Sequence, residues 1–255
     1  MYGSCKVIER DCPTDGLVRL TLAAPELAAQ ARPGQFVMLR SWDGPQPYLP
    51  RPISLNRIDP ARGEIGFLIR VKGLGTQLLS LCGQGDTVQA HGPLGNGFPL
   101  PSRGGRVALV GRGVGAAPLR PLAEACAARG CEISVYLSAR SEALLPDLAF
   151  YESLGAALTV STDENQKVTQ QLASDCRETP FTAAYSCGST RLARDVRLLQ
   201  KEYGFAAFIS LEAGMACGVG ACKGCAVRAV SDGGAPAYLR VCRDGPVFPL
   251  ERIVE

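Results

Sequence analysis

The chain has 255 residues, of which 46% are hydrophobic and 20% are charged, and its formal net charge at pH 7 is +3. This length suits two or three small domains, and the share of apolar side chains excludes an intrinsically disordered protein. The positive charge is small and its lysines and arginines are scattered along the chain, which argues against a nucleic-acid-binding surface.

Residues 1–101 are predicted to form a small antiparallel β-barrel. Short apolar runs in this part of the chain are separated by Gly, Pro and Asp, which are typical turn residues. Many short strands in succession indicate an antiparallel barrel. The runs are LVRLTLAA (17–24), GQFVMLRS (34–41), EIGFLIRV (64–71) and DTVQAHG (86–92).

Residues 102–204 are predicted to form a doubly wound α/β domain with a parallel sheet. Apolar runs suited to strands alternate here with segments of helix length, and such alternation places ligand sites at the carboxyl ends of the strands. The strand runs are RVALVG (106–111), EISVYLSA (132–139), AALTVST (156–162) and FTAAYSCG (181–188). The helical segments are 117–130, 144–155, 168–175 and 190–204.

Residues 205–255 are predicted to form a third, small unit that binds a metal cluster. The unit contains one apolar run, FAAFISLE (205–212), followed by a segment rich in cysteine and glycine. So short a unit cannot bury a sufficient apolar core by itself. We therefore expect a bound metal or a neighbouring domain to stabilise it.

The cysteine-rich segment has the ligand spacing of a plant-type [2Fe–2S] cluster. Cys217, Cys222 and Cys225 follow the pattern C-x4-C-x2-C, and Cys242 comes later in the chain. The intervening glycines allow sharp turns and a close approach of backbone N–H groups to sulfur. A structural zinc site is the competing interpretation, but it usually has two C-x2-C pairs, whereas this segment has one. Four buried, unligated cysteines are a further alternative.

The chain contains eleven cysteines, an odd number that cannot pair completely within one chain. It shows no apolar run of about 20 residues that could span a membrane, and its first residues do not resemble a signal peptide. We therefore expect a cytoplasmic protein with reduced thiols. Most of the cysteines outside the cluster motif are expected to be small core residues. They are Cys5, Cys12, Cys82, Cys126, Cys131, Cys176 and Cys187.

Six motifs along nearly the whole chain make it similar to the electron-transfer subunits of NAD-dependent dihydroorotate dehydrogenase, a branch of the ferredoxin-reductase superfamily. The first four occur throughout the superfamily, whereas the last two are more specific to the branch. In chain order they are RPISL (51–55), LIRVKGLGT (68–76), GPLGNGF (92–98), LVGRGVGAAPL (109–119), SLEAGMACGVGACKGC (210–225) and VCRDGPVF (241–248).

The resemblance implies that the barrel binds FAD. An arginine guanidinium can bind phosphate oxygens through two parallel hydrogen bonds, and a serine hydroxyl can hydrogen-bond to the edge of the isoalloxazine ring. Taken alone, the RPIS segment would instead be interpreted as a turn with a surface arginine. The residues assigned to FAD by resemblance are Arg51, Pro52, Ile53, Ser54, Leu68, Ile69, Arg70, Gly75 and Thr76.

The resemblance also implies that the α/β domain binds NAD(H) beside the flavin. A glycine-rich turn between a strand and a helix suits a dinucleotide, although it is also found as a plain tight connection. Three features depart from the family pattern and leave open a different electron donor or a lost nucleotide site: Arg112, Ser189 and the contracted stretch 161–172. The residues assigned to NAD(H) are Gly111, Gly113, Gly115, Cys187 and Gly188.

Two further residues receive no catalytic role. His91 is the only histidine in the chain, and a lone histidine is more often structural or solvated than catalytic. No Ser/His/Asp triad can be built without this histidine. Arg140 follows a predicted strand and could pair with the 2′-phosphate of NADP, but a surface arginine is the simpler interpretation.

A flavin beside a one-electron cluster suggests electron transfer between a two-electron nicotinamide and a one-electron acceptor. The resemblance implies dihydroorotate oxidation in pyrimidine biosynthesis, on a flavin-binding partner in a heterotetramer with two copies of each chain. The exposed cluster loop with Lys223 is the expected contact with that partner. Two alternatives remain open: a similar reductase that serves another dehydrogenase, a ferredoxin or an oxygenase, and a zinc-bound scaffold without redox activity.

Overall fold

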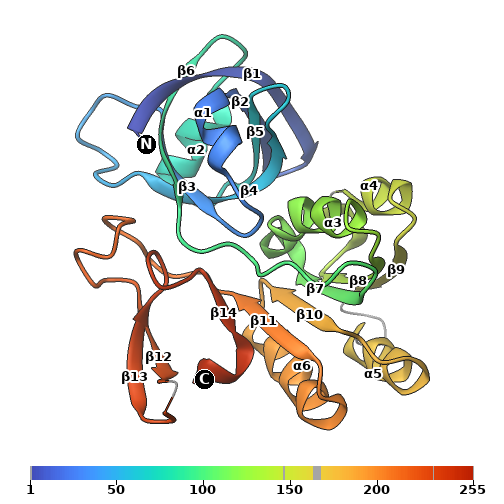
Figure 1. Cartoon of the computed structure of the whole chain (residues 1–255). Helices are drawn as coiled ribbons and strands as arrows, with labels where there is room; N and C mark the ends of the chain where they lie inside the picture. Colours follow the sequence, from blue (N-terminus) through green and yellow to red (C-terminus); the bar gives the residue numbers. More distant parts are fainter. Residues whose placement is uncertain (1, 146, 163–167, 232, 255) are drawn as a thin grey trace.

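The computed structural model describes residues 2–145, 147–162, 168–231 and 233–254. These residues form a closed barrel, a six-stranded open sheet with helices on both faces, and a two-stranded hairpin (Figure 1). The fold class expected from the sequence is confirmed. No helix in the described parts of the chain is long and apolar enough to cross a membrane.

The barrel closes in the strand order β1-β2-β5-β4-β3-β6, and every neighbouring pair is antiparallel. Leucine, isoleucine, valine and phenylalanine side chains from all six strands fill its interior. Its strands are β1 (Tyr2–Thr14), β2 (Leu17–Ala23), β3 (Phe36–Arg40), β4 (Arg51–Asp59), β5 (Glu64–Arg70) and β6 (Thr87–Leu94). Its two helices are α1 (Pro25–Gln30) and α2 (Leu74–Leu81).

The four apolar runs expected as barrel strands are β2, β3, β5 and β6, whereas β1 and β4 were not predicted as strands. Most side chains of β1 are at least partly exposed, so it lacks the apolar pattern of a core strand. The first four residues of β4 are only half-buried. Three of them, Pro52, Ile53 and Ser54, line a cavity outside the barrel, so this part of β4 lacks the pattern of a core strand.

The second sheet has the strand order β14-β11-β10-β7-β8-β9. Its five strands from β9 to β11 are parallel, and β14 runs antiparallel to β11. The central strands are buried along nearly their whole length, as expected when helices cover both faces of a parallel sheet. The strands are β7 (Arg106–Arg112), β8 (Glu132–Ala139), β9 (Ala157–Thr162), β10 (Ala183–Cys187), β11 (Ala206–Ser210) and β14 (Val247–Pro249).

Helices α3 and α4 cover one face of this sheet, and α5 and α6 cover the other (Figure 1). The ends of α6 follow from the sequence: the hydroxyl of Ser189 accepts a hydrogen bond from the N–H of Leu192, and Gly204 adopts a left-handed conformation after the last turn. The helices are α3 (Leu119–Ala127), α4 (Leu148–Ser153), α5 (Val168–Glu178) and α6 (Thr190–Tyr203).

The segment after residue 205 is joined to the α/β domain more closely than the sequence suggested. Strands β11 and β14 both belong to the large sheet, and only β12 (Ala226–Val230) and β13 (Pro236–Arg240) form a separate hairpin. Ala207 and Ile209 of β11 are buried in the same core as α5 and α6. The cluster segment therefore extends from the edge of the sheet, which supplies the apolar contacts that it cannot make alone.

A buried carboxylate joins the barrel to the α/β domain. The side chain of Asp147 is only 7% exposed, and its carboxylate lies 2.6 Å from Arg19 of β2 and 3.0 Å from Arg120 of α3. The amide of Asn56 in β4 donates to the same carboxylate over 3.3 Å. The two domains therefore meet through one acid that pairs with groups from both.

Candidate functional site

A cavity of about 240 Å³ lies between the barrel and the α/β domain. Its walls come from parts of the chain that are distant in sequence: strands β4 and β5, the start of α2, the turn before α3, the segment after β11 and the turn before β14. The residues that line it include Pro52, Ile53, Ser54, Leu68, Arg70, Lys72, Thr76, Val114, Leu211, Glu212, Ala213, Met215 and Pro246.

The barrel wall of this cavity contains most of the residues predicted to bind FAD. Pro52, Ile53 and Ser54 line it from β4, and Leu68 and Arg70 line it from β5. Ile69 lies between those two residues but points into the barrel core, where it is 1% exposed. Because side chains alternate along a strand, Leu68 and Arg70 can face the cavity only if the Ile69 side chain faces away from it.

Arg51 and the start of α2 form a second part of the predicted FAD site. The Arg51 guanidinium donates to the carbonyl of Leu49, and its side chain packs against Gly75, where an added Cβ would lie 2.7 Å from Nε. The Thr76 hydroxyl is used within the turn, since it accepts hydrogen bonds from the N–H groups of Lys72 and Gly73. In this part of the predicted site, the first-turn N–H groups of α2 and the Arg51 guanidinium are suited to bind phosphate.

The wall opposite the barrel was not predicted from the sequence. Leu211, Glu212, Ala213 and Met215 line the cavity directly after β11. A signal for them was present, because ligands bind beyond the carboxyl ends of parallel strands. The sequence analysis placed β11 outside the parallel sheet, so that rule was not applied to this segment.

A second cavity, of about 410 Å³, adjoins the first at Arg70, Lys72, Val114 and Glu212. Four cationic side chains line it, which suits the pyrophosphate of a dinucleotide. The residues that line it include Arg70, Lys72, Arg112, Gly113, Val114, Gly115, Arg140, Gly188 and Glu212.

Three of the five residues predicted to contact NAD(H) line this second cavity: Gly113, Gly115 and Gly188. The other two lie beneath it. A Cβ at Gly111 would lie 2.5 Å from the Cβ of Ala116, so this glycine permits close packing between β7 and the following turn. Cys187 is 2% exposed within the sheet, and burial raises the pKa of its thiol far above the ordinary value.

Replacing Gly115 with alanine is expected to weaken NADH binding about tenfold, by overpacking the contact between two loops. The added Cβ would lie 2.4 Å from the Cα of Gly188, so one of the two backbones must move. Titration of the FAD-loaded chain with NADH measures the effect. Gly44→Ala is the control, because its Cβ would meet no atom within 4 Å. Unchanged NADH affinity in Gly115→Ala would contradict the assignment of this turn.

The four cysteines of the predicted cluster site come together as two pairs. The N–H of Cys222 donates to the sulfur of Cys217 over 3.4 Å, and the sulfurs of Cys225 and Cys242 are 3.2 Å apart. Among the described residues, no three side chains of His, Cys, Asp or Glu are already gathered around one point. A cluster that uses all four thiolates would therefore draw the two pairs together.

The local chemistry of both pairs fits thiolate ligands. Backbone N–H groups of Cys222 and Val219 lower the pKa of the Cys217 thiol to about 6. Burial, reinforced by the neighbouring Cys225 thiol, raises the pKa of Cys242 to about 12. A buried thiolate at Cys242 thus requires a cation beside it, which the irons of a cluster supply.

The cluster loop is held in place by glycine turns and by one bidentate ion pair. Gly218 has φ +71° and packs against Met38 of the barrel, where an added Cβ would lie 2.9 Å from Cγ. Arg240 binds both carboxylate oxygens of Asp244 over 3.0 Å and donates to the carbonyl of Gly220 over 3.3 Å. The contacts of Arg240 connect the loop that carries three of the cysteines to the turn after Cys242.

The cluster loop and the first cavity, which contains most of the predicted FAD residues and is called the flavin cavity below, share the same two segments of chain. Met215 lines the cavity and Cys217 follows two residues later, so their Cα atoms are at most about 7.6 Å apart. Pro246 lines the cavity four residues after Cys242. The predicted flavin site and the predicted cluster site therefore lie next to each other in the structure.

Three further sequence expectations can be located. Arg112 ends β7, and Ser189 caps α6. Of the contracted stretch 161–172, residues 163–167 lie outside the described residues. His91 and Cys217 line the same surface cavity, and partial burial lowers the pKa of His91. Of the seven other cysteines, five are buried, Cys131 is half-buried and Cys12 is exposed.

Comparison with known proteins gives concordant results. Residues 212–254 match the iron–sulfur cluster binding domain of dihydroorotate dehydrogenase B. The chain is 38% identical to the "Dihydroorotate dehydrogenase B (NAD(+)), electron transfer subunit" of Desulforamulus reducens, over 91% of this chain and 90% of that protein. The subunit of the same name from Bacillus caldolyticus is 37% identical, over 92% of this chain and 91% of that protein.

A solved structure described as an NADH-dependent reduced ferredoxin-NADP oxidoreductase has a similar fold. It superposes with a TM-score of 0.83 at 27% identity, over 98% of this chain and 89% of that chain. The sequence identities above 35% extend over nearly the full length of both partners, and the matched cluster domain includes all four cysteines. The chain belongs to the family of electron transfer subunits of dihydroorotate dehydrogenase B.

Proposed function

We propose that this chain transfers electrons between the flavin of a catalytic partner subunit and NAD(H), through a [2Fe–2S] cluster and FAD, during oxidation of dihydroorotate to orotate. The main support is the succession of sites along the molecule. Met215 of the flavin cavity is two residues from Cys217, and the nucleotide cavity adjoins the flavin cavity at Arg70 and Glu212. A flavin bound between the cluster and the nucleotide can exchange two electrons with the nicotinamide and one electron at a time with the cluster.

The residues of the chain would bind and orient the three redox groups. Arg51 and the first turn of α2 would hold the FAD phosphates, and β4 would place Pro52 and Ser54 along the flavin ring. Arg70 and Lys72, at the junction of the two cavities, would balance the negative charge of both dinucleotides. Four thiolates from Cys217, Cys222, Cys225 and Cys242 would hold the irons.

Dihydroorotate would be oxidised on the partner, in a heterotetramer like that expected from the sequence, and we propose that the complex works in the cytoplasm. Lys223 is the candidate contact in the exposed cluster loop. It has φ 59°, a conformation that glycine adopts without strain. A lysine in such a position supports a role for its charged side chain, which would meet an acidic surface of the partner.

Anaerobic reduction of the co-purified complex tests this function. We expect dihydroorotate to bleach the flavin absorbance of both subunits, and NAD(+) to restore it while NADH forms. The isolated chain should be reduced by NADH and not by dihydroorotate, because the oxidation site lies on the partner. If another dihydro-compound bleaches the complex and dihydroorotate does not, the chain serves a different dehydrogenase.

A further inference from the structure

Two cysteines outside the cluster motif are neighbours at the end of helix α3. Cys126 is in the last turn of the helix, and Cys131 directly precedes strand β8. The N–H of Cys131 donates to the carbonyl of Cys126 over 3.1 Å. The N–H of Gly130, which has φ +70°, donates to the carbonyl of Ala127 over 2.9 Å. These hydrogen bonds and the left-handed glycine form a Schellman motif, in which the side chains at the positions of Cys126 and Cys131 are commonly in contact.

The two thiols interact with each other, but their surroundings differ. Cys126 is 0% exposed, whereas Cys131 is half-buried and its sulfur lies 3.5 Å from the carbonyl oxygen of Ser102. Burial raises the pKa of the Cys126 thiol to about 12, and the neighbouring Cys131 thiol reinforces this rise, while the cation of Arg129 opposes it. Cys131 is therefore the thiol that a small oxidant reaches first, and a second thiol lies directly beside it.

The chemistry of this contact differs from that of an ordinary Schellman motif. The contact is normally made by apolar side chains, and cysteine can serve as a small one. Here both contacting positions are cysteines, and one of them is accessible from solvent. A sulfenic acid formed on an accessible thiol condenses with a neighbouring thiol to a reversible disulfide, whereas an isolated one is open to irreversible oxidation.

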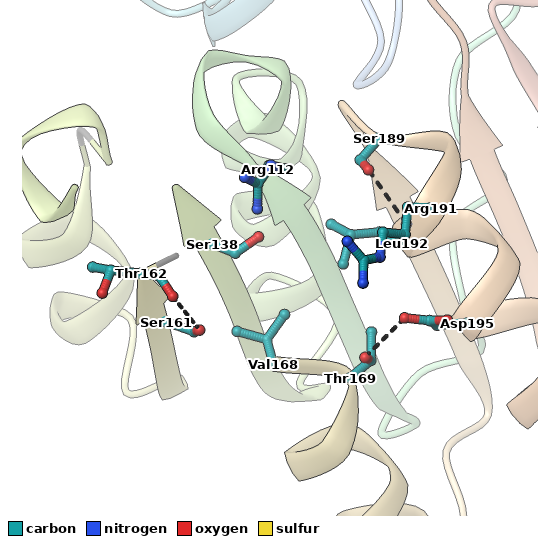
Figure 2. Close-up of a pocket in the computed structure, with 10 residues that line it drawn as sticks. All are labelled: Arg112, Ser138, Ser161, Thr162, Val168, Thr169, Ser189, Arg191, Leu192 and Asp195. Carbon is teal, nitrogen blue, oxygen red and sulfur yellow. Dashed lines mark hydrogen bonds between the residues drawn. The ribbon is translucent and has the colours of Figure 1, made fainter. Parts of the chain in front are cut away.

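The cysteine pair lies at the opposite edge of the sheet from the cavities. The second cavity lies at the carboxyl ends of β7 and β8. A third cavity, of about 400 Å³, also lies at that edge, where Arg112 and Arg191 approach it from β7 and α6 (Figure 2). Cys131 precedes the first residue of β8, so the whole strand separates it from that edge. Neither Cys126 nor Cys131 is among the described residues that line the three cavities.

We propose that Cys126 and Cys131 form a reversible disulfide when the chain is exposed to hydrogen peroxide, which reduced flavins generate from oxygen. The Cys131 thiolate attacks one peroxide oxygen and the O–O bond breaks, which gives a sulfenic acid and a hydroxide that takes up the thiol proton as water. The Cys126 sulfur then displaces the hydroxyl group from the Cys131 sulfur, and the Cys126 proton leaves with it as a second water.

This reaction is balanced. The two thiols lose two electrons and two protons, and one hydrogen peroxide becomes two waters. The bond protects Cys131 from irreversible oxidation and joins the end of α3 to the start of β8. A disulfide of this kind is a redox-sensing group and not part of a permanent framework, so it agrees with thiols that are reduced under ordinary conditions.

Peptide mapping of the complex after treatment with hydrogen peroxide tests the bond. Trypsin cleaves after Arg129, between the two cysteines, so a disulfide joins peptides 113–129 and 130–140. We expect most of the chain to yield the linked peptides, with a mass about 2 Da below that of the two reduced peptides together, and dithiothreitol to separate them. The cluster cysteines lie in other tryptic peptides, so damage to the cluster cannot produce this linked pair.

Labelling of sulfenic acids with dimedone gives a second readout. In Cys126→Ala the Cys131 sulfenic acid has no partner, so labelling of Cys131 should rise at least about fivefold over the wild-type chain. Cys176→Ala is the matched control, because Cys176 is also buried in the α/β domain, at 2% exposed, and its loss should leave the linked peptides unchanged.

The exposed Cys12 serves as an internal reference, because its oxidation shows that peroxide has reacted with the chain. If Cys12 is oxidised while peptides 113–129 and 130–140 stay unlinked, the inference is wrong. Equal dimedone labelling of Cys131 in the wild-type chain and in Cys126→Ala would also refute it. None of these measurements involves electron transfer, so the proposed function is tested separately.

Discussion

Replacing Cys242 with serine is expected to remove the iron from this chain and to slow electron transfer between the partner's flavin and NAD(H) by at least about 100-fold. Loss of a group that only supports a metal ligand already costs about 10- to 100-fold, and Cys242 is expected to be a ligand itself. The Cys242 sulfur is buried 3.2 Å from that of Cys225, so no solvent molecule can easily take its place. Iron analysis and anaerobic spectra of the complex measure the effect.

The FAD content distinguishes loss of the cluster from misfolding. The residues predicted to bind FAD lie on β4, β5 and α2, so a correctly folded Cys242→Ser chain should retain its flavin and remain reducible by NADH. Cys131→Ser is the matched control, since Cys131 is half-buried beside Ser102 and far along the chain from the cluster loop. A Cys242→Ser chain with full iron content, or a wild-type chain isolated with zinc, would overturn the cluster assignment.

Replacing Asp147 with alanine is expected to lower the free energy of unfolding by about 3 to 5 kcal/mol. The change leaves Arg19 and Arg120 without their shared carboxylate, although their side chains are only 24% and 19% exposed. It also removes a hydrogen-bond acceptor from the buried Asn56. Urea unfolding of the FAD-loaded chain, followed by flavin fluorescence, measures the loss.

The same substitution should also weaken FAD binding, because the flavin cavity has one wall on each side of this joint. Asp11→Ala is the control: Asp11 also pairs with Arg19, over 3.1 Å, but its side chain is 49% exposed. An exposed pair of this kind contributes at most about 1 kcal/mol. Equal losses of stability in the two variants would show that burial of the Asp147 carboxylate has no special effect.

The strands and helices that could be predicted are those in which the order of apolar and polar residues follows the burial of the side chains. Residues 107–111 of β7 are all apolar and buried because helices cover both faces of the strand, and α6 has a recognisable cap at each end. Strand β1 was missed because most of its side chains remain exposed. Strand β11 was assigned to the cluster unit, since a local pattern does not reveal which sheet a strand joins.

The predicted site residues divide in a similar way. Three of the predicted cluster cysteines lie in one loop between β11 and β12, and Cys242 lies in the turn after β13. Their spacing could be recognised because it is a local property of the sequence. Ile69, Gly111 and Cys187 were assigned by resemblance, and their side-chain positions instead lie in the barrel core or within the sheet. Glu212 and Met215 were missed, although they follow a parallel strand and line the flavin cavity.

The sequence by itself determined the family, the barrel and the parallel sheet, and the four cysteines that would hold a cluster. These features depend on short-range spacing and on the alternation of apolar and polar residues, and both can be recognised from the order of residues in the chain. The tertiary structure alone decided that Met215, Val114 and Pro52 face one cavity, and that Arg112 and Arg191 face another. Such contacts join residues that are far apart in sequence, so they exist only after the sheet, the barrel and the cluster loop have packed together.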